Sequence, residues 1–250
     1  MDFEEEKNSK ITFSDRSPSE LLSRGFQREI NLVKIGSGIL ILSFLFFLIY
    51  TTISTIITIT DVYGKITSIF IVISQNFYSI LLVVGIICLS IALHRLTNYF
   101  PNRYKITFII SYLLLDLIII FRIVLAIISH SIVIFQRNIL VIALTHIFDI
   151  VLVSVCISIS LILLGFILNQ LKSIDGMNVW LLIMPFISVI VPIFILGSGV
   201  PYMLGNTRVF EILFIVSLFL YSFIEIGVFL ELLLAFNRIE PKKIFDYIYQ

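Results

Sequence analysis

Five ionisable side chains interrupt long apolar runs, and they are the residues of this sequence that could do chemistry. Asp116 and Arg122 lie in one run, His146 and Asp149 in the next, and Glu225 in the last. A charged side chain near the centre of a bilayer costs about 2.5–3.5 kcal/mol on insertion scales, so such residues normally face protein or water and have a partner. We therefore take these five as candidates for an intramembrane charged or polar pathway.

His146 and Asp149 are one helical turn apart, and Arg122 is predicted to lie at their depth. The runs that hold them are joined near residue 134, so they should form a helical hairpin. An arginine–carboxylate contact there has two interpretations. It is an ion pair that locks the hairpin, which the sequence favours, or a gated pair in which His146 or Asp149 takes up a proton during transport.

The rest of the His146–Asp149 helix carries further small polar side chains. At helical spacing, Cys156 and Ser160 extend the Asp149 face, which should therefore contact protein. Ser154 and Ser158 fall on the opposite side of the helix. There a hydroxyl can bond back to its own backbone, so these two serines predict little.

Asp116 and Glu225 have no cation partner that the sequence shows. Each lies close to the middle of its apolar run, so the two carboxyls could meet near the midplane of the membrane. A proton shared between them would indicate a proton-coupled or cation-binding site. Neutral acids bonded to Tyr112 and Tyr221, one turn before each, would indicate a static bundle. The sequence leaves both readings open.

Two prolines interrupt another apolar run, at positions 185 and 192. Because they are seven residues apart, Pro185 and Pro192 share one helix face, and each removes a backbone hydrogen bond. Ordinary kinking is the simpler interpretation. The alternative is a discontinuous helix whose freed carbonyls line a pathway, as in many transporters.

The composition predicts a polytopic membrane protein. Hydrophobic residues make up 59% of the 250 residues and charged residues only 13%, with a mean hydropathy of +1.11. Soluble domains carry roughly 25% charged residues. Since a membrane-spanning helix needs roughly 20 apolar residues, we predict an all-α bundle of six transmembrane helices. The predicted spans are 35–60, 68–93, 106–129, 139–168, 179–197 and 209–236, forming one transmembrane domain over 35–236.

Lysine and arginine predict the orientation of this bundle. One side has the flanking residues Arg16, Arg24, Arg28, Lys34, Arg95, Arg103, Lys105, Lys172, Arg238, Lys242 and Lys243. The other side has only Lys65, Arg137 and Arg208. By the positive-inside rule, the segment 1–34 and the tail 237–250 are both cytoplasmic. We predict a multi-pass protein of the cell membrane in contact with membrane lipid.

The N-terminal segment contains a predicted amphipathic helix over 18–33. Ser17 and Pro18 are typical of a helix start. Phe26, Ile30 and Val33 then follow at helical spacing, which favours a helix along the cytoplasmic membrane interface. Its simpler role is a lead-in helix that anchors the first span, and the alternative is a docking helix for a cytoplasmic partner.

Known enzyme signatures are missing from the sequence. It has no nucleotide-binding, zinc-protease or serine-hydrolase motif, and Cys88 and Cys156 lack the spacing of a metal or redox site. We therefore predict no catalytic residue, metal or cofactor, with an intramembrane enzyme as a minor alternative. The net charge of +1 does not indicate direct nucleic-acid binding.

The function that these observations favour is membrane transport. We expect a channel or translocation-pore subunit, energised by an ion gradient or by a separate cytoplasmic ATPase, with a macromolecule such as DNA or protein as one candidate substrate. Six spans are few for a complete carrier, so we expect a homo-oligomer or other membrane subunits. The alternatives are a structural or assembly subunit of a membrane complex and a proton-coupled carrier of small solutes.

Overall fold

The structure is a computed structural model that describes residues 18–60, 65–131, 139–170, 183–190, 193–194, 197 and 207–239. The long helices are α1 (Pro18–Thr60), α2 (Lys65–Leu96), α3 (Asn102–Ser131), α5 (Ile139–Gln170) and α7 (Thr207–Arg238). A short helix covers 183–190. No strand occurs among these described ranges, so the predicted all-α class is confirmed for them.

Five helices of the described part are long and apolar enough to cross a membrane, as expected for a membrane protein. Five of the six predicted spans fall inside α1, α2, α3, α5 and α7. The remaining one, 179–197, lies only partly within the described residues. The count of six spans and the sidedness of the termini therefore stay predictions.

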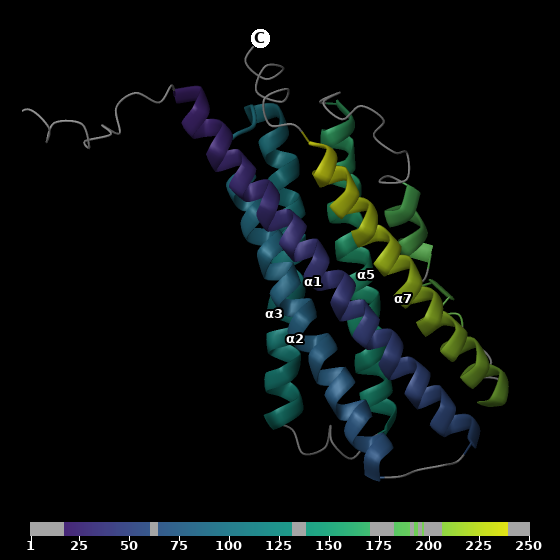
Figure 1. Cartoon of the computed structure of the whole chain (residues 1–250). Coiled ribbons are helices and arrows are strands. Elements are labelled where there is room, and N and C mark those ends of the chain that lie inside the picture. Colours follow the sequence, from purple (N-terminus) through teal and green to yellow (C-terminus); the bar gives the residue numbers. More distant parts are fainter. Residues whose placement is uncertain are drawn as a thin grey trace, which may run out of the picture.

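The amphipathic segment 18–33 is not a separate interfacial helix. It is the first part of α1, which continues without a break from Pro18 to Thr60 (Figure 1). Its apolar face packs inside the protein, where Phe26 meets Tyr99 edge to face at 5.5 Å and Phe100 at 5.9 Å. Burial raises the pKa of Tyr99, and the nearby Glu29 carboxylate raises it further. The unbroken α1 agrees with the lead-in helix expected before the first span. Only the placement along the membrane surface differs, because an apolar stripe fits a protein partner as well as a membrane surface.

The helices pack in a defined order. α1 contacts both α2 and α7, α2 contacts α3, and α3 contacts α5 (Figure 1). The contact between α1 and α2 depends on two glycines. A Cβ on Gly85 would lie 2.6 Å from the Cγ of Leu40 and 3.2 Å from the carbonyl oxygen of Gly36. Small residues at such a crossing let two helix backbones approach closely.

An aromatic cluster fills the centre of the bundle. Phe44 of α1 packs against Tyr78 of α2 at 5.9 Å, and against Tyr221 and Phe229 of α7 at 5.4 and 6.0 Å. Phe47 touches both tyrosines as well. These rings join α1 and α2 to α7, the helix that carries Glu225.

α5 is the most enclosed of the five apolar helices. Of its most apolar window, 61% is buried, compared with 22% for α3. Ser154, Ser158 and Ser160 are each 0% exposed although they lie on different sides of the helix. Ser160 also exchanges hydrogen bonds with Ser111 of α3, each hydroxyl donating to the other's carbonyl, at 3.0 and 3.3 Å.

Candidate functional site

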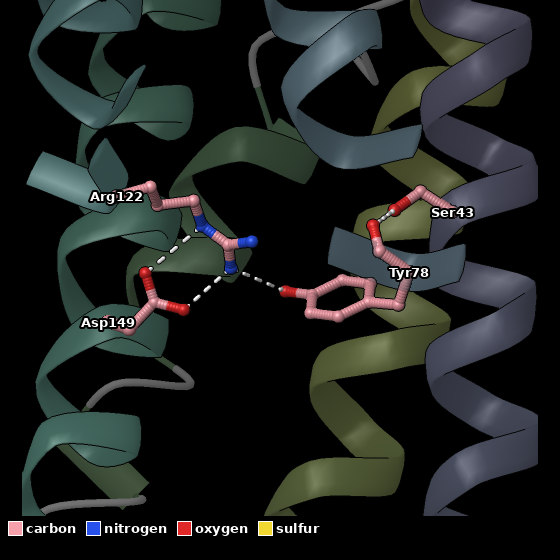
Figure 2. Close-up of polar contacts among 4 residues, drawn as sticks. All are labelled: Ser43, Tyr78, Arg122 and Asp149. Atoms are coloured by element: carbon pink, nitrogen blue, oxygen red, sulfur yellow. Dashed lines mark hydrogen bonds and ion pairs between the residues drawn. The ribbon is translucent and has the colours of Figure 1, made fainter. Parts of the chain in front are cut away.

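Arg122 of α3 and Asp149 of α5 form a two-bond ion pair inside the bundle. Nη2 donates to Oδ2 at 2.6 Å and Nε donates to Oδ1 at 3.1 Å (Figure 2). The side chains are 11% and 12% exposed. The contact predicted from the hairpin is therefore confirmed. A parallel pair of charge-assisted bonds is the strong geometry for these groups. The His146 side chain lies outside the described residues.

Tyr78 of α2 joins the Arg122–Asp149 pair, and we call these three residues the ionic cluster. The Arg122 Nη2 reaches the Tyr78 hydroxyl at 3.5 Å, and the guanidinium carbon lies 5.4 Å from the ring centroid. The Ser43 hydroxyl of α1 donates to the backbone carbonyl of Tyr78 at 2.9 Å. Figure 2 shows all four residues in one layer. Sequence reasoning missed Tyr78 because one tyrosine in an apolar run carries no signal of its partner.

Glu225 of α7 is the most deeply buried acid of the described chain, at 0% exposed. The Ser188 hydroxyl, on the short helix 183–190, donates to its Oε1. Its Oε2 has no hydrogen-bond partner among the described residues. Among those residues, the ion pairs are Arg122–Asp149 and Arg95–Glu29, so Glu225 has no counter-ion there.

Ser188 also connects the short helix to α5. The Ser154 hydroxyl donates to the Ser188 carbonyl at 3.0 Å, and the two hydroxyl oxygens lie 3.1 Å apart. In an unbroken helix this carbonyl would accept from the N–H of residue 192, but that residue is a proline without an N–H. Pro192 thus leaves the Ser188 carbonyl available to Ser154. We call Ser154, Ser188 and Glu225 the serine–glutamate cluster.

The serine–glutamate cluster bears on two features of the sequence. Ser154 could have bonded to its own helix, but it bonds to a different segment, since α5 is buried on more than one side. A freed carbonyl belongs to the discontinuous-helix alternative, and the Ser188 carbonyl accepts from outside its own helix. The choice between that alternative and ordinary kinking stays a prediction. Pro185 is buried in the 183–190 helix, whereas Pro192 itself lies outside the described residues.

Asp116 and Glu225 do not meet, so one of the two readings left open, a proton shared between them, is wrong. The Ser90 hydroxyl of α2 donates to Oδ1 of Asp116, and α3 and α7 are not in contact. Tyr112, the predicted partner of Asp116, packs edge to face against His94 at 5.0 Å. The expectation rested on depth alone, and equal depth does not bring helices together.

Tyr221 belongs to the aromatic cluster and lies one turn before Glu225 on α7, where it is 0% exposed. Its ring packs edge to face against Phe44 and Phe47. Its hydroxyl has no hydrogen-bond partner among the described residues, so the bond to Glu225 that one reading of the sequence expected is not formed there.

The described residues hold no group of three or more His, Cys, Asp or Glu side chains that could bind a metal ion. The two clusters offer buried hydrogen-bonding groups, among them one carboxyl without a counter-ion in the described structure. Comparison with protein-family models, with curated proteins and with solved structures finds no match for this chain.

Proposed function

We propose that the protein is an integral membrane transport protein in which Glu225 exchanges protons. The observation that supports this most is the setting of the Glu225 carboxyl, which is completely buried, has no counter-ion in the described structure and is bonded to a separate short helix. Ionisable side chains inside a membrane domain are costly, and they commonly mark ion or substrate pathways.

In the closed bundle Glu225 would be a neutral acid. An unpaired carboxylate in an apolar interior is far more costly than a hydrogen-bonded carboxylic acid. Loss of the proton would create a charge that only water or a cation could stabilise. The Ser188 hydroxyl would stay bonded to Oε1, and water or a cation entering beside the unpartnered Oε2 would open a path along α7.

Transport through this protein would need a source of energy. Without a nucleotide-binding motif, an ion gradient or a separate cytoplasmic ATPase would drive the process, and the chain would act as a channel or translocation-pore subunit. The excess of lysine and arginine on one side supports cytoplasmic termini and a place in the cell membrane.

A structural subunit is the second candidate, and the Arg122–Asp149 pair favours it. That pair is nearly buried and doubly bonded, which is what a static lock between α3 and α5 requires. In such a protein Glu225 would stay protonated and immobile.

Proton flux into liposomes distinguishes the two candidates. When a membrane potential is imposed, the reconstituted protein should lower the pH inside the liposome, which an enclosed pH-sensitive dye reports. Glu225→Gln should abolish this proton flux. Glu231→Gln is the matched control, since Glu231 is a half-buried acid on the same helix and its loss should leave the flux intact. Wild-type flux equal to that of empty liposomes would contradict proton exchange and favour the structural subunit.

A further inference from the structure

A groove of about 590 Å³ lies between α1 and α2, at the end of the bundle where α1 begins and α2 ends. Arg24, Arg28 and Arg95 line one part of it. Leu32, Ile35 and Ile91 line the other. Its volume falls in the range of small-molecule sites, roughly 300–1,000 Å³.

The charged part of the groove has an excess of positive charge. Arg95 contacts the buried Glu29 at 3.6 Å, so its charge is balanced. Arg24 and Arg28 are exposed and form no ion pair within the described residues. Two guanidinium groups are therefore available to an anion, and guanidinium matches the geometry of a phosphate.

The lining of the groove changes from charged to apolar along α1, from its N-terminal end toward the middle of the bundle. Arg24, Arg28, Leu32 and Ile35 follow one face of α1 over roughly 16 Å, at a rise of about 1.5 Å per residue. The apolar span of α1 begins at Arg24, and the apolar span of α2 ends at Leu96. The arginines thus mark the edge of the apolar zone, and the isoleucines lie within it.

We infer that this groove binds an anionic phospholipid. Arg24 and Arg28 hold the headgroup phosphate, and an acyl chain lies along Leu32, Ile35 and Ile91. A free phosphate ion would use only the arginine part, whereas the lipid matches both. Basic pockets between transmembrane helices bind such headgroups in the same way. This site is independent of Glu225 and of the transport proposed above.

Lipid binding can be measured by native mass spectrometry on the full-length protein in a neutral detergent. Phosphatidylglycerol and phosphatidylcholine with identical acyl chains are added in parallel. Arg24→Gln and Arg28→Gln should each weaken phosphatidylglycerol binding about fivefold. The matched control is Arg103→Gln, because Arg103 stacks on Tyr104 at 4.6 Å outside the groove.

The wild-type protein should retain phosphatidylglycerol in preference to phosphatidylcholine, and excess inorganic phosphate should not displace it. Equal binding of both lipids would overturn the inference. So would an Arg103→Gln effect as large as that of Arg28→Gln. Displacement by inorganic phosphate would show an ion site in place of a lipid site. Size-exclusion chromatography of each variant verifies that it is folded.

Discussion

The hydroxyl of Ser154 donates to the backbone carbonyl of Ser188 at 3.0 Å, across two segments of the bundle. Proline at position 192 supplies no N–H to the same carbonyl, so Ser154 is a donor that the helix itself does not provide. A backbone defect that the sequence encodes therefore favours the serine–glutamate cluster.

Replacing Pro192 by alanine should make Ser154 dispensable. In the wild type, Ser154→Ala leaves a buried carbonyl without its donor and should lower the free energy of unfolding by about 0.6–1.7 kcal/mol. In a Pro192→Ala background the new N–H can bond to Ser188, so the same change should cost less. A double-mutant cycle, measured by denaturation in mixed micelles, gives the difference.

The control for this cycle is Ser158→Ala, one turn further along α5. The Ser158 hydroxyl is buried and has no hydrogen-bond partner in the described structure, so its loss should be neutral in both backgrounds. An equal cost of Ser154→Ala with and without Pro192 would contradict the role of the proline.

The Arg122–Asp149 pair should behave as a coupled unit. Arg122→Leu leaves an unpaired buried carboxylate and should destabilise the fold by about 3–5 kcal/mol. Adding Asp149→Leu removes that charge and should restore most of the loss. Thermal unfolding in detergent checks this. A double variant no more stable than Arg122→Leu would show that the pair does not lock α3 to α5.

The crossing of α1 and α2 should tolerate no side chain at Gly85. Gly85→Ala would place a Cβ 2.6 Å from Leu40 and should destabilise the fold by about 1–3 kcal/mol. Gly38→Ala is the matched control, because a Cβ there meets nothing within 4 Å. The unfolding midpoints of the two variants are compared. Equal midpoints would mean that the backbones are not in tight contact at this point.

The contacts that could be predicted from the sequence are those between helices that follow one another directly in the chain. Arg122 and Asp149 are on a helical hairpin joined by a short turn, so their depths, and hence their contact, could be worked out. Asp116 and Glu225 are far apart in the chain, and no local rule shows which helices touch. Their real partners, Ser90 and Ser188, are small hydroxyl side chains whose role becomes visible only after packing.

The α1–α2 groove was also beyond sequence reasoning. Arg24, Arg28 and Arg95 served there only to orient the chain. Their meeting depends on the Gly36–Gly85 contact, which brings the two helices together. Glu29 went unnoticed because an acid among surface arginines reads as an exposed residue, although the structure buries it.

The protonation of Glu225 is the most direct test of the proposed mechanism. Infrared spectroscopy of the reconstituted protein reads the carbonyl stretch of a carboxylic acid across a pH titration. We expect the wild type to show a buried acid that loses its proton as the pH rises. Glu231→Gln should keep this signal and Glu225→Gln should lack it. Identical spectra for the wild type and Glu225→Gln at every pH would contradict the proposal that Glu225 exchanges protons.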